Sequence, residues 1–125
     1  MNEDTSQQCY SVCSVGQLKH AESLEFSLPL GQQACFLINW EGHYYAYLNT
    51  CPHTQVSLNW TPNQFFDVES KFIQCSLHGA LFEPDTGFCL HGPCQGKSLT
   101  GLPVLIQNER VCIDLNNGAI PLKSP

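Results

Sequence analysis

Two short stretches, Cys51-Pro52-His53 and Cys75-Ser76-Leu77-His78, decide how the rest of this chain is interpreted. Each stretch supplies one thiol and one imidazole within three or four residues. Two Cys and two His can hold a structural zinc ion, or a [2Fe–2S] cluster in which His replaces Cys on one iron. Zinc fingers tend to place both Cys in one half-site and both His in the other, whereas each half-site here is mixed. The pattern therefore favours the iron–sulfur centre, with a Cys2His2 zinc module as the alternative.

The residues around these half-sites resemble the Rieske family of iron–sulfur proteins. The segment 49–53, Asn-Thr-Cys-Pro-His, is similar to the first cluster loop of that family, and 75–79, Cys-Ser-Leu-His-Gly, is similar to the second. Residues 82–87 match its hairpin turn, Gly92-Pro93 its third loop and 102–104 its returning strand, so the resemblance spans roughly residues 32–115. Residues 54–74 make a longer connection than small Rieske ferredoxins have, which predicts a loop insertion around 61–70.

The resemblance implies one [2Fe–2S] cluster held by four residues of this chain. By analogy, Cys51 and Cys75 hold a buried iron, and His53 and His78 hold an outer iron near the surface. It further implies that Pro93 covers the cluster. Backbone N–H groups around three positions are expected to donate hydrogen bonds to sulfur, namely Thr54, Gly79 and Ala80.

The surroundings of the second half-site predict a low reduction potential. High-potential Rieske proteins resemble this chain but carry a serine and a tyrosine where Ala80 and Phe82 stand, and their hydroxyls raise the potential. Such proteins also have a loop disulfide at the positions of Val56 and Leu77. Because neither feature is present, we expect a ferredoxin-like centre near the bottom of the Rieske range, roughly −150 mV.

Composition excludes several function classes. The chain has 125 residues, a formal charge of −6 and only five Lys plus Arg, so nucleic acid is not an expected partner. The acidity suits docking on a basic patch of another protein, or simply keeps the protein soluble. No Gly-x-Gly-x-x-Gly fingerprint or other signature of a bound substrate or flavin is present, so no small-molecule substrate is expected.

The eight cysteines and the N-terminal sequence predict a cytoplasmic protein. Residues 1–6 have no basic or apolar region typical of a secretory signal, and no stretch approaches 18 apolar residues. We therefore expect no membrane association, and cysteines that are ligands or thiols before they are disulfides. Cys89 and Cys94, on either side of Gly92-Pro93, are interpreted as small buried or free thiols, with a redox-active pair as the alternative.

The apolar pattern predicts an all-β fold, because short apolar runs alternate with turn residues and no window shows helical periodicity. The expected strands are 9–15, 24–28, 34–38, 44–48, 72–74, 80–82, 88–90, 103–107 and 111–115. We expect one domain, 1–125, with a frayed terminus at 1–8. It comprises a Rieske-like antiparallel β sandwich or barrel base, about 9–48 and 97–122, and a loop-rich cluster-binding subdomain, about 49–96. Phe65 and Phe66 in the insertion either pack on the base or form a partner patch.

Together these features predict an electron carrier. It would pass one electron at a time from a reductase to a terminal oxygenase or similar enzyme. The alternatives are the small Rieske subunit of a nitrite-reductase-like enzyme, which Rieske-like chains of this size can be, and a structural zinc module.

Overall fold

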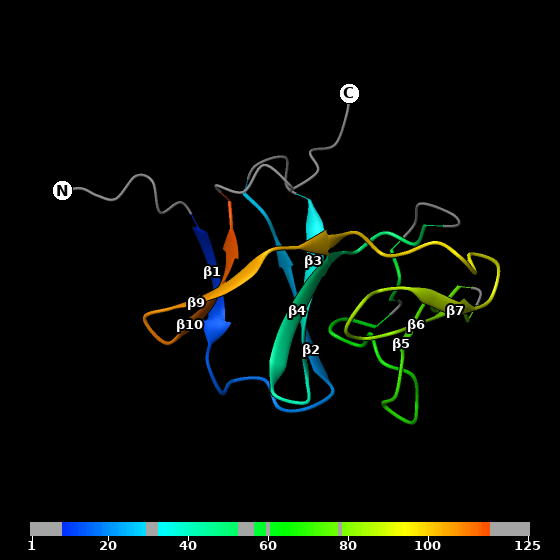
Figure 1. The fold of residues 1–125 in the computed structure, drawn as a ribbon, viewed down its shortest axis with the longest axis horizontal. Coiled ribbons are helices and arrows are strands. Elements are labelled where there is room, and N and C mark those ends of the chain that lie inside the picture. The colour runs from blue at the N-terminus through cyan, green and yellow to red at the C-terminus, as the bar shows by residue number, and fades with distance from the viewer. Residues whose placement is uncertain (1–8, 30–32, 53–56, 60, 78, 116–125) are drawn as a thin grey trace.

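The fold is built from short antiparallel strands. A computed structural model describes residues 9–29, 33–52, 57–59, 61–77 and 79–115. Across these ranges the chain forms ten strands and no helix, arranged in three sheets (Figure 1). This confirms the predicted all-β class. In the same ranges, no helix is long and apolar enough to cross a membrane.

The first sheet joins the two ends of the described chain. Its strands, in spatial order, are β1 (Cys9–Ser14), β10 (Arg110–Asp114) and β9 (Val104–Gln107). Both pairings are antiparallel, and a register shift interrupts the β1–β10 ladder between Ser11 and Cys13. The sheet therefore closes the base with strands that are distant in sequence.

The second sheet forms the centre of the molecule. Its order is β2 (Glu22–Ser27), β3 (Ala34–Trp40), β4 (His43–Leu48) and β8 (Gly101–Leu102). The resemblance placed a returning strand at 102–104, but the sequence did not predict β8 as a separate strand, which pairs Leu102 with Ala46 of β4. Pro103 follows β8 and has no N–H to donate, so the expected strand 103–107 begins at Val104 instead.

The third sheet is small and carries the second half-site. It contains β5 (Ile73–Gln74), β6 (Leu81–Phe82) and β7 (Cys89–His91), all antiparallel, and lies to the right in Figure 1. The segments between β5 and β6 and just beyond β7 are the second and third loops that the sequence predicted.

Two hairpins end in two-residue turns with left-handed backbone at both positions. Glu41 and Gly42 have φ of 54° and 86°, and Asn108 and Glu109 have φ of 54° and 61°. Such primed turns match the right-handed twist of the strands they connect. The β3–β4 hairpin delivers the chain directly to the first cluster loop.

Strand β3 is buried on both faces, which explains its continuous apolar sequence. Side chains alternate across a strand, so Cys35 and Leu37 face one core while Phe36 and Ile38 face another. The first core lies between the two larger sheets and includes Val111. The second core joins the central sheet to the loop region that contains the half-sites.

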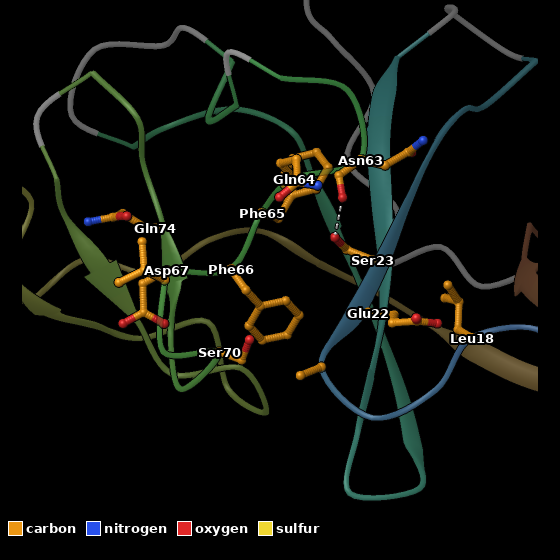
Figure 2. Close-up of a pocket in the computed structure, with 12 residues that line it drawn as sticks. Leu18, Glu22, Ser23, Asn63, Gln64, Phe65, Phe66, Asp67, Ser70 and Gln74 are labelled. Atoms are coloured by element: carbon orange, nitrogen blue, oxygen red, sulfur yellow. Dashed lines mark hydrogen bonds between the residues drawn. The ribbon is translucent and has the colours of Figure 1, made fainter.

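The insertion at 61–70 packs on the base. The Phe65 ring stacks on Phe36, and the Phe66 ring stacks on Trp40 with centroids 5.8 Å apart. At the edge, the Ser23 hydroxyl of β2 donates to the Asn63 carbonyl at 2.8 Å, and the two lie face to face beside a pocket (Figure 2). Packing is thus the correct alternative for these aromatic residues. Trp60 lies outside the described residues.

Candidate metal centre

The first half-site is anchored by a buried asparagine. The Asn49 N–H donates to the Ala34 carbonyl at 2.9 Å, which continues the β3–β4 register by one residue. Its Oδ1 accepts from the Leu58 N–H at 2.8 Å, and its Nδ2 donates to Asn59 Oδ1 at 3.0 Å. One side chain therefore holds both ends of the loop that contains Cys51, which is itself buried.

The second half-site is a tight turn between β5 and β6. The Cys75 N–H donates to the Ala80 carbonyl at 2.9 Å, and the Gly79 N–H donates back to the Cys75 carbonyl at 2.8 Å. Gly79 has φ of +70°, a conformation that glycine adopts without strain. This closure holds the Cys75 side chain in the interior, where it is fully buried.

The Leu58 peptide connects the two half-sites. While its N–H donates to Asn49, its carbonyl accepts from the Ser76 N–H at 2.6 Å. Sequence reasoning missed both Asn49 and Leu58 in this role. The position of Asn49, immediately after a strand and two residues before a candidate ligand, was the only available signal, because such polar residues often bond the loop backbone.

The third loop approaches the second half-site at a glycine. Gly92 has φ of +108°, and a Cβ placed on it would lie 2.8 Å from the Ala80 Cα. Only a glycine permits this contact without displacement of one loop. Pro93 is exposed at the surface, and the next residue, Cys94, is buried.

Four of the residues predicted at the cluster, Cys51, Cys75, Ala80 and Phe82, belong to one buried group. Ala80 and Phe82 are both fully buried, so apolar groups occupy the positions where hydroxyls would raise the potential. The buried group combines sulfur with apolar side chains and includes Cys51, Cys75, Ala80, Phe82, Cys89 and Cys94.

The histidine half of the site lies outside the described residues. This applies to His53 and His78, and also to Thr54. The described residues alone contain no group of three or more metal-ligating side chains. The four-ligand set, and the hydrogen bonds to sulfur expected at Thr54, Gly79 and Ala80, therefore stay predictions.

The cysteine half fits the implied cluster. Two thiolates and two neutral imidazoles on an oxidised [2Fe–2S] core give a net charge of zero, which an apolar environment tolerates far better than a charged group. Cys51 and Cys75 are both buried in that environment, on loops tied together through Leu58. The donor chemistry and the burial thus agree with the expected inner iron.

A third thiol beside the first half-site was not assigned there from sequence. Burial raises the pKa of the Cys94 thiol to about 12, and the neighbouring Cys89 and Cys51 side chains add to the shift. Cys94 is therefore a neutral hydrogen-bonding group at physiological pH. The expectation that Cys89 and Cys94 are small and buried is confirmed.

Comparison with known proteins assigns the family. The model of the Rieske [2Fe-2S] domain family matches residues 8–110, which is most of the chain. The chain belongs to this family. As a member, it carries one [2Fe–2S] cluster and functions in one-electron transfer, so the zinc alternative is set aside.

Solved structures with this fold include ferredoxins and the terminal oxygenase of carbazole 1,9a-dioxygenase. The ferredoxin of carbazole 1,9a-dioxygenase from Nocardioides aromaticivorans IC177 is 22% identical, with a TM-score of 0.68 over 86% of this chain and 97% of that chain. The Sphingomonas yanoikuyae B1 ferredoxin is 25% identical, with a TM-score of 0.64 over 86% and 98%.

A third match comes from a complex of reduced oxygenase and oxidized ferredoxin in carbazole 1,9a-dioxygenase. That chain is 21% identical, with a TM-score of 0.68 over 86% of this chain and 94% of that chain. A search of curated proteins found no match.

Proposed function

We propose that the protein is a low-potential Rieske-type ferredoxin that takes one electron from a reductase and delivers it to a terminal oxygenase. The alignment with free-standing ferredoxins supports this role, because it covers nearly their whole length. A matched chain also comes from an oxygenase–ferredoxin complex, so a protein of this fold can dock on an oxygenase. The protein would act as a carrier and catalyse no reaction of its own.

Four residues are proposed as ligands. Cys51 and Cys75 would hold the inner iron, because their side chains are buried between the tied loops. His53 and His78 would hold the outer iron. When bound, the cluster accepts and releases a single electron. The chain's contribution is to exclude water from the sulfur side through Phe82 and Ala80 and to fix the loops through Asn49.

The observation that carries the low-potential proposal is the burial of Ala80 and Phe82. Neither side chain can donate a hydrogen bond, and neither is exposed to water that could do so. Hydrogen bonds to cluster sulfur stabilise the reduced, more negative state. Their absence at both side chains should therefore leave the potential low.

Docking would use the surface around the second half-site. Leu77, between Cys75 and His78, is an apolar side chain that is 43% exposed. An apolar tip on a chain of net charge −6 suits a partner with a small apolar contact surrounded by basic groups. The proposed compartment is the cytoplasm, where thiols stay reduced.

The domain division follows the same reasoning. Residues 49–96 would form the cluster-binding subdomain, and 9–48 with 97–122 would form the base. Within the described chain, the two larger sheets draw their strands from the proposed base segments. Residues 116–122 lie outside the described part.

The first test is metal and sulfide analysis of anaerobically purified protein, with EPR and a redox titration on the same sample. We expect two irons and two sulfides per chain, a reduced-state spectrum of low average g, and a midpoint roughly at −150 mV. A midpoint well above 0 mV would contradict the low-potential proposal. One zinc and no sulfide would contradict the whole assignment.

The ligand role of His78 is tested by His78→Cys. A thiolate in place of a neutral imidazole adds negative charge to the site, so an intact cluster should have a lower midpoint. His43→Cys, at an exposed position of β4, is the matched control and should leave the midpoint unchanged. An unchanged midpoint in an intact His78→Cys cluster would show that His78 is not a ligand.

A further inference from the structure

Two cysteine thiols that the proposed ligand set does not use are in direct contact. The Cys94 thiol donates a hydrogen bond to the Cys89 sulfur, with the two Sγ atoms 3.1 Å apart. Both side chains are buried, at 0% and 1% exposure. A disulfide bond is 2.03–2.05 Å long, so a shift of about 1 Å would bring the sulfurs to bonding distance.

The backbone fixes this contact. The Cys89 N–H donates to the Lys97 carbonyl at 2.8 Å, and the Lys97 N–H donates to the Cys94 carbonyl at 2.9 Å. The segment from 89 to 97 thus folds back on itself through Gly92, whose φ of +108° turns the chain. Because both sulfurs belong to one closed loop, they can bond with little rearrangement elsewhere.

The pair lies directly against the first half-site. The Cys51 side chain is one of the close neighbours that raise the pKa of the Cys94 thiol. Both cysteines share the buried group that contains Cys51 and Cys75. A change at Cys94 is therefore transmitted by contact to a sulfur that we assign to the inner iron.

We propose that Cys89 and Cys94 form a reversible dithiol–disulfide couple in the buried group that contains Cys51. The oxidant is a low-molecular-weight disulfide. The two cysteine S–H bonds break and one Cys89–Cys94 bond forms, while the S–S bond of the oxidant is cleaved. Two electrons pass from the cysteine sulfurs to the oxidant, and the two protons complete its two product thiols.

Oxidation would remove a hydrogen-bond donor from the cluster side. The single Cys94 S–H donates to Cys89 in this structure and would have to rotate about the Cβ–Sγ bond to donate to the Cys51 sulfur; in the disulfide Cys94 has no S–H to donate to either. Loss of a hydrogen bond to a ligand sulfur lowers the potential of an iron–sulfur centre. The lowered potential rests on the proposed role of Cys51 as a ligand, whereas formation of the Cys89–Cys94 disulfide does not.

Burial sets the rate of the exchange and therefore the design of the test. Only a thiolate attacks a disulfide, and burial keeps Cys94 in its neutral form. The exchange must therefore proceed through transient opening of the loop, and it has to be followed to equilibrium.

The experiment uses the purified holoprotein in anaerobic glutathione buffers of stepped ratio. After acid quenching and alkylation, peptide mass spectrometry measures the fraction of chains with a Cys89–Cys94 crosslink. We expect that fraction to rise to near completion across the series and to fall to zero after dithiothreitol is added. Thiols at Cys89 and Cys94 that remain fully alkylatable in the most oxidising buffer would overturn the proposal.

Matched variants keep the result specific. Cys13→Ser removes a buried thiol in the other core and should leave the crosslink unchanged, whereas Cys94→Ser should abolish it. If Cys94→Ser does not fold, the wild-type mapping still decides the chemistry. A crosslink between other cysteines, with none between 89 and 94, would also overturn the proposal.

The effect on the cluster is measured on the same samples. The midpoint of crosslinked protein should be more negative than that of reduced protein, and reduction should restore it. If the crosslink is complete and the midpoint is unchanged, the proposed effect on the cluster through Cys51 is wrong. The Cys89–Cys94 dithiol–disulfide couple would still stand. If the protein held no iron, the proposed function would fail, while the crosslink would still be detected or excluded by mass.

Discussion

The rings of Phe36 and Phe65 stack with their centroids 4.1 Å apart and their planes inclined by 8°. Phe36 belongs to β3 of the central sheet, and Phe65 belongs to the insertion. Both are fully buried. The insertion is thus part of the second core and supports the strand that enters the Cys75 loop, since the Gln74 N–H donates to the Phe65 carbonyl at 2.9 Å.

Replacement of Phe65 by alanine should destabilise the protein strongly. Truncation of a buried phenylalanine removes its transfer free energy and leaves a cavity, at a cost of about 3–5 kcal/mol. Thermal unfolding followed by circular dichroism measures the loss. Val68→Ala is the control, because Val68 is fully exposed in the same insertion and should change the melting temperature little. Equal melting temperatures for the two variants would refute the packing role.

Gly92→Ala should disrupt the loop contact near the cluster, whereas Gly96→Ala should not. Both glycines have positive φ, so each substitution costs about 1–2 kcal/mol of backbone strain. Only at Gly92 would the new Cβ meet a neighbour, the Ala80 backbone at 2.8 Å; nothing lies within 4 Å of the corresponding position at Gly96. We expect a larger loss of stability and of iron for Gly92→Ala, measured by thermal unfolding and iron analysis. Similar iron contents would show that the close approach is unimportant.

Asn49→Ala should loosen the first half-site. The substitution leaves the Leu58 N–H without its acceptor, and an unsatisfied buried donor costs about 1–3 kcal/mol. Because the same side chain fixes the loop around Cys51, iron should be lost faster to a chelator than in the wild type. Gln95→Ala, at an exposed position in the third loop, is the control. An unchanged chelation rate in Asn49→Ala would remove Asn49 from the site.

Alkaline pH should destabilise the protein partly through Cys35. Burial raises the pKa of this thiol to about 11 from an ordinary value of 9.0. The folded state therefore keeps the proton between about pH 9 and pH 11, while the unfolded chain loses it. The contribution of the Cys35 thiol to the free energy of unfolding is therefore complete below pH 9. It decreases as the pH rises from about 9 to about 11, by at most about 1.4 kcal/mol per pH unit.

The measurement is the apparent melting temperature of wild type and Cys35→Ala at pH 8 and pH 10.5. The variant should lose less stability than the wild type over this interval, whatever its stability at pH 8. Parallel losses in the two proteins would show that the Cys35 thiol ionises equally in the folded and unfolded states.

The sequence alone determined the fold class and the family, and it predicted the cysteine half of the site. These follow from local features: apolar runs bounded by turn residues, the Glu41-Gly42 and Asn108-Glu109 turns, and half-sites of three or four residues. Such features depend on backbone preferences and on ligand chemistry, both of which are expressed over a few neighbouring positions. The pairing of the four ligands is still a sequence-based prediction, because His53 and His78 lie outside the described residues.

Only the tertiary structure decided what the loops do to one another. It placed Phe65 on Phe36, gave Leu58 its role between Asn49 and Ser76, and brought Cys94 onto both Cys89 and Cys51. It also added β8, a two-residue strand defined by its partner β4 and not by its own sequence. The physical reason is the same in each case: a contact between distant segments depends on the path of the intervening chain, which local residue preferences do not encode.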